Sequence, residues 1–506
     1  MLATVSSATI LGVEGRPVTV EVHVTVGLPA FTVVGLPDAA CRESRDRVRA
    51  AIQSSHLEWP TKKVTVNLAP SAERKIGTGL DVAIALAVLA ATEQLPLDAL
   101  IGVGCIGELG LDGSLRPVAG AVSLVDALPD GVAVVPTECA RQARLVGRHD
   151  VRPVGRLVDL VLALRGEGSW PDPPEPPPPP PAPPPPDLAD VRGQPVARQA
   201  LEIAAAGGHH LLFVGSPGAG KTMLARRLPG LLPPLGREDA LAVTRVMSAA
   251  GIEVPGGGLV TRPPFRAPHH SSTLVSLVGG GTASLRPGEL SLASRGVLFL
   301  DEMGEFPPSV IDALRQPLEE GVVRVARARA TVTLPARFLL VAATNPCPCG
   351  GATEPGECRC SESARTRYRR RLSGPILDRF DLRVTVHRPE PTALLATAAG
   401  EGTEVVAERV ATARALAADR GVEANALIPA RRLDEVAPLD GGAARMLVTA
   451  LRQGRLTARG LARVRRVART VADLDGTDPA APLGAEPVAL AMALRGAIVT
   501  GSEAAA

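Results

Sequence analysis

Apolar and polar residues alternate along the first third of the chain in a way that predicts strands. Valine recurs at every second position within residues 16–26, and residues 63–68 repeat this period of two, as expected for strands with one buried face. Residues 38–54 and 80–91 instead have patterns typical of helices. The N-terminal part is therefore predicted to be an α+β domain.

The middle of the chain alternates short apolar runs with helical segments, which is the pattern of a parallel α/β sheet. These runs occupy residues 211–214, 296–300 and 338–344. Strand signals stop near residue 389, and the remainder is predicted to be a small helical domain. Its helices are expected at residues 405–420, 442–452, 457–474 and 488–500.

A proline-rich segment separates the first two patterns. Residues 171–186 contain 13 prolines in 16 positions, which excludes helix and sheet because proline lacks an N–H donor and fixes φ. We expect extended polyproline II of roughly 50 Å, at about 3.1 Å per residue. The segment is a stiff spacer or, alternatively, a ligand for a proline-recognition domain. The predicted parts of the chain are residues 1–168, a linker at 169–186, residues 187–388 and residues 389–506.

Composition narrows the class of protein. The net charge of +3 is too small to indicate a nucleic-acid partner by itself, and 2% aromatic residues argue against base-stacking platforms. The sequence has no run of about 20 apolar residues, so it predicts no membrane span. The first residues lack the basic start of a secretory signal, and the seven cysteines do not suggest a secreted disulfide framework. The expected compartment is the cytoplasm.

The most specific motif follows the first apolar run of the middle part. Residues 215–222, GSPGAGKT, fit the phosphate-binding loop of nucleotide hydrolases, and a helix is expected directly after them. Lys221 would neutralise the phosphates and Thr222 would hold Mg²⁺. Lys221 is one of only four lysines among 55 basic residues, which indicates that a flexible point charge is needed there. The predicted nucleotide-binding residues are Gly215, Ser216, Pro217, Gly218, Ala219, Gly220, Lys221 and Thr222.

The other two apolar runs end in polar residues that would complete this site. Asp301 and Glu302 follow the second run, where Asp301 would bind Mg²⁺ through water and Glu302 would polarise the attacking water. Asn345 follows the third run and would orient that water near the γ-phosphate. The alternative for Asn345 is an ordinary turn residue at a strand end.

Four cysteines cluster shortly after Asn345. They form two C-x-C pairs whose thiolates are a ligand set for tetrahedral Zn²⁺, and the alternative is four reduced structural thiols. The neighbouring His269 and His270 are not expected to bind a metal, because adjacent side chains point in different directions. The candidate zinc ligands are Cys347, Cys349, Cys358 and Cys360.

These motifs, together with residues 373–381, SGPILDRFD, resemble a AAA+ ATPase. Residues 265–272, FRAPHHSS, and 286–292, RPGELSL, resemble its magnesium-chelatase-like branch, and nearly the whole chain is similar to the ComM/YifB family. The resemblance implies a multidomain α/β fold: a AAA+ core with a parallel sheet covered by helices on both faces, and a C-terminal helical lid. It also implies ATP as the nucleotide and a homo-oligomeric ring, expected to be a hexamer.

The resemblance assigns roles to further residues. Val191 and Gln194 match the segment that contacts adenine in such proteins. Arg379 matches the arginine finger, which would reach the nucleotide of the neighbouring subunit; a solvated arginine is the alternative. Arg459 matches the sensor-2 position, which would contact the γ-phosphate in cis, although several other arginines lie close to it in the sequence.

The N-terminal domain resembles a ribosomal-S5/Lon-like fold, the proteolytic domain of the Ser/Lys protease Lon. The match runs through residues 75–77 and 107–113. Gly79 stands where the nucleophilic serine is expected, and Ala121 and the residues after it supply no lysine. Without both groups acyl transfer has no route, so the domain is expected to bind or assemble and not to cleave peptides.

Residues 321–334 are predicted to form a basic β-hairpin, whose Arg324, Arg327 and Arg329 would contact phosphates with little sequence preference. In the resembling family such a hairpin points into the channel of the ring, and the alternative is an ordinary solvated face. The resemblance favours a DNA translocase or branch-migration helicase in recombination or natural transformation, acting on branched or single-stranded DNA. A magnesium-chelatase-like or chaperone-type motor that remodels a protein partner is the second reading.

Overall fold

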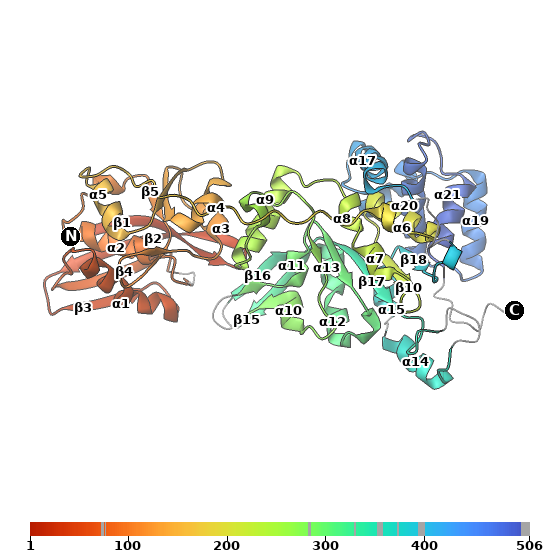
Figure 1. The fold of residues 1–506 in the computed structure, drawn as a ribbon, viewed down its shortest axis with the longest axis horizontal. Coiled ribbons are helices and arrows are strands. Elements are labelled where there is room, and N and C mark those ends of the chain that lie inside the picture. The colour runs from red at the N-terminus through yellow and green to blue at the C-terminus, as the bar shows by residue number, and fades with distance from the viewer. Residues whose placement is uncertain are drawn as a thin grey trace.

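Three bodies follow one another along the molecule in the computed structural model. Figure 1 shows a sheet at the N-terminal end, a second sheet in the middle and a group of helices at the C-terminal end. The described residues are 1–71, 75, 77–281, 285–327, 330–351, 358–371, 374–392 and 400–496.

The N-terminal body is built on a seven-stranded mixed sheet with the order β3-β4-β2-β1-β5-β8-β9. Alternate valines of β2, from Val18 to Val24, are buried, as the valine period predicts. Helices α1 (Ala39–Ser54) and α2 (Asp81–Ala91) confirm the predicted helices, and every residue of α2 is buried. The strands are β1 (Leu2–Leu11), β2 (Glu14–Thr25), β3 (Ala30–Val34), β4 (Lys63–Ala69), β5 (Val103–Cys105), β8 (Val132–Pro136) and β9 (Asp150–Val154).

The middle body is built on a five-stranded parallel sheet with the order β11-β14-β17-β10-β18. Successive residues of β10 face opposite sides: Phe213 packs toward the C-terminal helices, and Leu212 packs toward the other face. Burying a side chain of this size contributes about 2 kcal/mol or more. The strands are β10 (Leu211–Val214), β11 (Phe265–Arg266), β14 (Val297–Leu300), β17 (Leu339–Thr344) and β18 (Leu382–Thr385).

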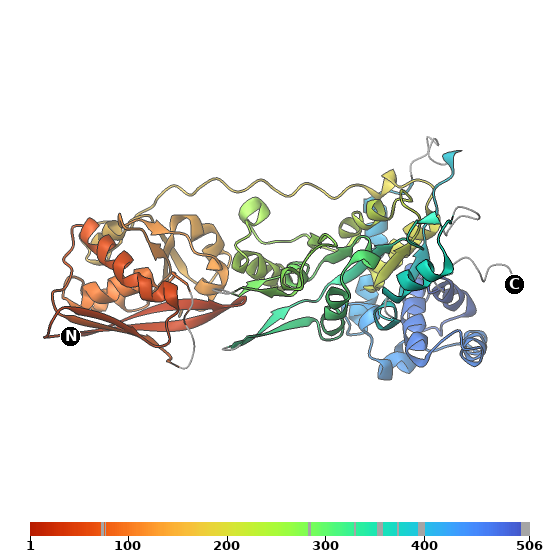
Figure 2. The same ribbon diagram turned by 90° about the horizontal axis from the view of Figure 1, so that it is seen from below.

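Helices cover both faces of this sheet. The C-terminal helices share one core with the strands, in which Val410 and Val467 belong to the same cluster as Phe213. A two-stranded hairpin extends from the other face toward the N-terminal body (Figure 2). The elements used below are α6 (Pro195–Gly207), α7 (Lys221–Ala225), α9 (Arg237–Ala249), α13 (Arg315–Glu320), α14 (Glu362–Arg371), α17 (Thr403–Asp419), α19 (Gly441–Arg452), α20 (Ala458–Leu474), α21 (Ala485–Ala493) and the hairpin of β15 (Val322–Arg327) and β16 (Ala330–Pro335).

The N-terminal body is docked on the middle body through α9 and the hairpin. Val13, in the turn between β1 and β2, is buried in one cluster with Val332 and Leu334 of β16. The backbone N–H of Gly120 donates to the carbonyl of Ser248 at 2.9 Å. An ion pair of 2.7 Å joins Arg245 to Asp126, and Ser248 Oγ donates to Gln142 Oε1 at 2.6 Å. Apolar burial and polar contacts therefore fix this interface together.

The proline-rich linker runs along the surface as an extended chain (Figure 2). Arg141 of the N-terminal body binds the carbonyl of Pro176 at 2.7 Å. Gly256 and Arg262 of the middle body donate to the carbonyls of Pro179 (3.1 Å) and Pro183 (2.6 Å). The linker is thus attached to both bodies. Among the described residues, none of the helices has the length and apolar character needed to cross a membrane.

Candidate functional site

The phosphate loop lies at the carboxyl edge of the parallel sheet, between β10 and α7. Gly218 and Gly220 have φ angles of +79° and +93°, which residues with a side chain rarely adopt. A Cβ atom at Gly215 would lie 2.2 Å from the carbonyl oxygen of Val386. The path of the backbone itself therefore requires glycine at these motif positions.

The Lys221 ammonium points into this loop. Its Nζ donates to the carbonyl oxygens of Gly215 (2.6 Å) and Ser216 (3.0 Å) and to Oδ1 of Asn345 (3.2 Å). Burial lowers the pKa of Lys221, and the nearby carboxylates of Asp301 and Glu302 oppose this shift. Two of the predicted residues, Lys221 and Asn345, are thus in direct contact although 124 positions separate them.

The two carboxylates lie beside the loop. Thr222 Oγ1 donates to Asp301 Oδ2 at 2.6 Å, and this hydroxyl and carboxylate are the hard oxygen ligands that Mg²⁺ prefers. Glu302 has a left-handed backbone, with φ 51° and ψ 47°, which is uncommon for a residue with a Cβ atom and frequent at functional sites. The groups share a cavity of about 410 Å³, lined by residues 217–223, Asp301, Glu302, Thr344 and Asn345.

His270 is a neighbour of this site that the sequence reading missed. Its Nδ1 lies 3.5 Å from Glu302 Oε2, and its ring is tilted by 34° against that of His269, with the ring centres 4.1 Å apart. The histidine pair precedes β14 by more than twenty residues, and only the folded chain brings it to Glu302. The one available signal was its place in the FRAPHHSS segment.

Gln194 and Val191 lie behind the phosphate loop. Gln194 Nε2 donates to the carbonyls of Ala219 (3.2 Å) and His387 (2.6 Å), so its side chain ties the loop to the segment after β18. Val191 is buried in the core shared with β10. Both residues are therefore placed to support the nucleotide loop, and contact of this segment with adenine stays a prediction.

Arg379 lies at the opposite, amino edge of the sheet. It lines a cavity of about 700 Å³ with residues at the starts of the strands, among them His210 and Leu339. Its guanidinium forms an ion pair with Glu319 of α13. Arg379 does not line the phosphate-loop cavity, and its role as an arginine finger stays a prediction.

Arg459 lines the same cavity as Arg379 and not the phosphate-loop cavity. Contact of Arg459 with the γ-phosphate in cis stays a prediction. Arg459 lies on α20, which packs on α6. Arg463 and Arg466 of the same helix also line this cavity.

The four cysteines converge into one cluster in which all Sγ atoms lie within 4.8 Å of one another. Cys347 Sγ is 3.4 Å from Cys349 Sγ and 3.6 Å from Cys358 Sγ, and the last two are 3.8 Å apart. Backbone N–H groups, first that of Gly351, lower the pKa of Cys349 to about 6, which favours the thiolate. Residues 352–357, between the two pairs, lie outside the described residues.

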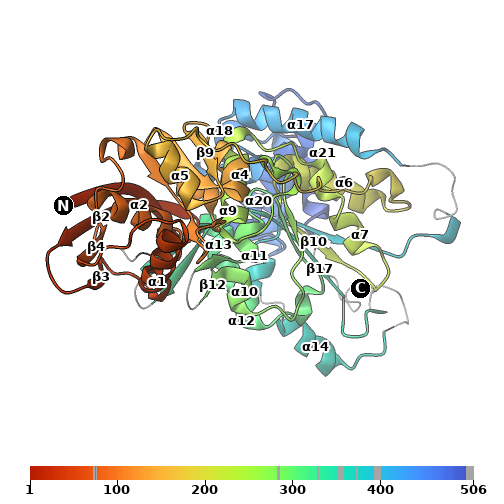
Figure 3. The same ribbon diagram turned by 60° about the vertical axis from the view of Figure 1, so that its left-hand side comes forward.

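This cysteine cluster lies against the phosphate loop. A Cβ atom at Gly350 would lie 2.4 Å from Cδ of Pro217, so the two loops are in close contact. From α14, Tyr368 places its hydroxyl 3.2 Å from Oγ1 of Thr344, the residue before Asn345. Helix α14 projects from the middle body on the side away from α17 (Figures 1 and 3).

The remaining predicted positions are spread over the molecule. Arg324 on β15 is exposed and forms an ion pair of 2.5 Å with Glu320. Arg329 lies outside the described residues, and Arg327 is described only in its backbone. Gly79, at the position expected for a protease nucleophile, faces Val118, and Ala121 is buried at the start of a short helix.

Comparison with known proteins agrees with this layout. Residues 187–394 match the family model of magnesium chelatase, subunit ChlI; residues 20–137 match subunit ChlI of Mg-chelatase, and 400–495 match its C-terminal part. The chain is 46% identical to an uncharacterized protein of Mycobacterium tuberculosis, over 97% of both chains. It is 42% identical to the uncharacterized protein YifB of Escherichia coli and 41% identical to the competence protein ComM of Haemophilus influenzae, over 94% of each chain. A partial match, 26% identical over 35% of this chain and 22% of the relative, is to the probable DNA helicase MCM9 of Arabidopsis thaliana.

Proposed function

Because the chain belongs to the ComM/YifB family of magnesium-chelatase-like ATPases, we propose that it is an ATP-driven ring motor that moves along DNA. The observation that carries the proposal is the convergence of Lys221, Asn345 and the two carboxylates on one cavity. These residues come from three parallel strands that end at the same edge of the sheet, which is where such sheets bind ligands.

Hydrolysis follows from the placement of these groups. When the nucleotide binds, the Lys221 ammonium leaves the two carbonyl oxygens and Asn345 and contacts the β- and γ-phosphates instead. Thr222 and Asp301 would hold Mg²⁺, which would supply positive charge against the phosphates. Glu302 accepts a proton from the attacking water, and Asn345 orients that water. His270, 3.5 Å from Glu302, is placed to hold the carboxylate in position.

Arg379, at the amino edge, is proposed to serve a neighbouring subunit as the arginine finger, and its ion pair with Glu319 is then exchanged for the neighbour's γ-phosphate when the ring closes. Arg459 is proposed as the sensor-2 residue that contacts the γ-phosphate of its own subunit. Each nucleotide is then held by the phosphate loop and Arg459 of one subunit and by Arg379 of the next, which requires a ring; we propose a hexamer.

DNA is the proposed cargo. The hairpin of β15 and β16 carries Arg324, which exchanges Glu320 for a backbone phosphate, and Arg327 and Arg329 are proposed to do the same. Two relatives, a competence protein and a probable DNA helicase, support this cargo. Residues 1–168 are proposed as a Lon-like assembly domain, 169–186 as the linker, 187–388 as the motor core and 389–506 as the lid.

The cysteine cluster is proposed to hold a structural Zn²⁺. Four thiolates at a Zn–S distance of about 2.3 Å stand roughly 3.8 Å apart in a tetrahedron. The observed Sγ separations of 3.4, 3.6 and 3.8 Å fit this edge length. A closed site of this kind fixes the loop that packs on Pro217.

The test is the ATPase rate with and without forked or four-way DNA across a salt series. Lys221→Ala and Glu302→Gln are expected to lower the rate about 100-fold or more, because each removes a group that acts in the transition state. Lys62→Ala, at an exposed lysine of the N-terminal body, is the matched control and keeps the wild-type rate.

The same experiment separates the two cargoes. DNA is expected to stimulate the wild-type rate, and Arg324→Ala should reduce the salt slope of DNA binding by about one. An ATPase that ignores DNA at low salt and responds to a protein would favour a chelatase-like or chaperone-type motor. The absence of ATPase activity in the wild type would reject the motor altogether.

A further inference from the structure

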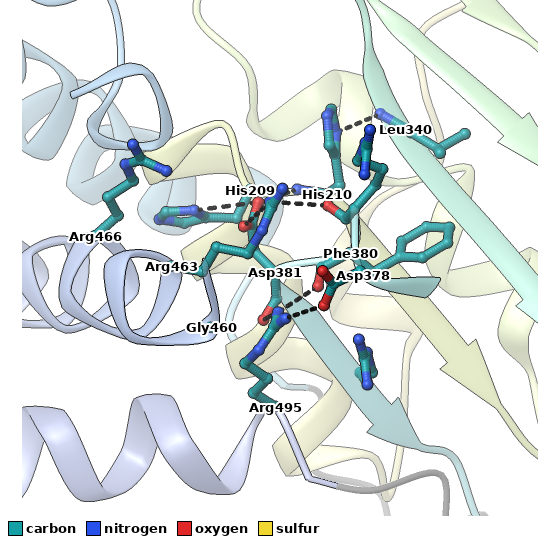
Figure 4. A network of polar contacts seen from close by, with 12 residues as sticks. His209, His210, Leu340, Asp378, Phe380, Asp381, Gly460, Arg463, Arg466 and Arg495 are labelled. Carbon is teal, nitrogen blue, oxygen red and sulfur yellow. Dashed lines mark hydrogen bonds and ion pairs between the residues drawn. The ribbon is translucent and has the colours of Figure 1, made fainter. Parts of the chain in front are cut away.

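A buried carboxylate, Asp381, lies where three parts of the molecule meet (Figure 4). They are the turn that carries Arg379 (residues 378–381, the finger turn), the C-terminal helices of the lid, and the sheet. Asp381 lies two residues after Arg379 and directly before β18, and it is 4% exposed. An ionised carboxylate is costly to bury unless charged and hydrogen-bonding partners surround it. The partners of Asp381 therefore indicate which parts of the molecule it is built to hold.

Three partners reach Asp381 from two directions. Arg463 of α20 donates to its Oδ1 at 2.6 Å, and the backbone N–H of His210 donates to its Oδ2 at 3.1 Å. His209 Nδ1 lies 3.7 Å from the same Oδ2. Burial alone would raise the pKa of Asp381, yet His209 and the charge of Arg463 hold it well below its usual range. These partners favour the charged form of the carboxylate.

The lid also holds the backbone of the finger turn. Arg463 donates with the same NH1 group to the carbonyl of Arg379 at 3.0 Å. Arg495, just after α21, donates to the carbonyl of Phe380 at 2.6 Å. Two lid arginines therefore hold two consecutive carbonyls of this turn, and Asp381 fixes one of these arginines.

The sheet connects this junction to the phosphate loop. His210 and Asp381 precede Leu211 and Leu382, which are paired in the parallel register of β10 and β18. Four residues further along, β10 enters the phosphate loop. Next to it, the carbonyl of His387 binds Gln194, which also binds the loop residue Ala219. A movement of Asp381 would therefore also move the starts of β10 and β18, and the other ends of these two strands lie at the nucleotide site.

We propose that Asp381 is a positioning residue for the finger. Through Arg463 and the start of β10 it fixes the position of Arg379 relative to the sheet, so that Arg379 meets the neighbouring subunit's nucleotide. This inference rests on the proposed function, because it acts on a finger that serves another subunit. Asp381 does not line the phosphate-loop cavity, and its proposed effect is exerted through the turn. A shift of about 1 Å in a group that stabilises a transition state can cost about 100-fold in rate.

The test compares Asp381→Asn with Asp434→Asn in the full-length protein. Asp434 is 91% exposed and pairs with Arg465 on the same helix α20, so it is a matched aspartate that does not touch the finger turn. We expect Asp381→Asn to lower kcat about 10- to 100-fold with KM for ATP within about twofold. Asp434→Asn should keep both values. Equal kcat in wild type and Asp381→Asn would overturn the proposal.

A double variant separates positioning from general damage. If Asp381 acts through the finger, Asp381→Asn should lower kcat no further in an Arg379→Ala background, whereas independent effects would multiply and overturn the proposal. If Asp381→Asn does not fold, Arg463→Gln, from a partly exposed position, must show the same loss and the same lack of additivity. A wild-type rate in Arg379→Ala alone would instead reject the finger, which belongs to the proposed function.

Discussion

His210 shows at the residue scale how burial makes the middle body sensitive to acid. Its Nδ1 accepts the backbone N–H of Leu340 at 3.1 Å, and burial lowers its pKa to about 4. In the unfolded chain the value is about 6.5, so the unfolded state takes up the proton first as the pH falls. The stability is fully present above pH 6.5 and is lost as the pH falls toward 4, by roughly 3 kcal/mol.

His210→Asn is expected to reduce this pH dependence. The amide oxygen of asparagine can still accept the N–H of Leu340 but does not titrate in this range. Thermal unfolding at pH 7.5 and pH 5 should show a larger loss of Tm for the wild type than for the variant. Parallel losses in both proteins would show that other groups cause the acid sensitivity.

The sequence indicated which residues lie together where polar groups follow the ends of strands. Lys221, Asn345 and Asp301 are each marked by a short apolar run followed by a polar group, and the structure brings them together. His270 and Asp381 carry no such mark, because their partners come from segments far away in the sequence. Helix α20, which carries Arg459, was predicted from its pattern, but its position in the fold depends on packing that no local pattern encodes.

The cysteine loop is the element whose contacts carry the clearest prediction. Its Gly350 packs on Pro217, so loss of the metal should loosen a wall of the nucleotide site. Removal of zinc by a chelator, or Cys349→Ser, is expected to raise KM for ATP several-fold and to lower Tm. Metal analysis should give one zinc per chain. Cys139→Ser, at a buried cysteine of the N-terminal body, is the control and keeps the metal. A zinc-free protein with unchanged KM and Tm would contradict the site.

Elements were predictable when they were long and regular. The helices expected at 405–420 and 457–474 are α17 and α20, shifted by at most two residues. The helix after the phosphate loop ends at Ala225, and a second short helix, α8 (Leu228–Leu231), carries Pro229 near its start. The strands β11 and β18 escaped the sequence reading because they are short and contain arginine. Pairing with neighbouring strands, not their own pattern, makes them strands.

At the scale of the whole molecule, one prediction concerns the interface that holds the N-terminal body on the middle body. A protease site can be introduced into the linker beside Ala182. After cleavage there, both fragments should elute together, because the interface between the N-terminal and middle bodies holds them. Val13→Asp places a charge in the shared core and should let the cleaved fragments separate. Separation of the cleaved wild-type fragments on a sizing column would show that the linker alone connects them.

Ring assembly gives a second prediction at this scale. Lys221→Ala removes one subunit's nucleotide site and leaves its finger, and Arg379→Ala does the reverse. If fingers act in trans, a mixture of the two inactive proteins should regain a substantial part of the wild-type rate after reassembly. A mixture no more active than its components would place the finger in cis.

The position of the linker was readable from its prolines, but its course along the surface was not, because proline content predicts extension and not attachment. That course limits the movement of the N-terminal body. An extended polyproline chain is within about 10% of the greatest length that a peptide can reach, so the linker has almost no slack. The N-terminal body cannot reach across to a neighbouring core without the linker breaking its contacts. A core whose linker keeps these contacts therefore also keeps its own N-terminal body.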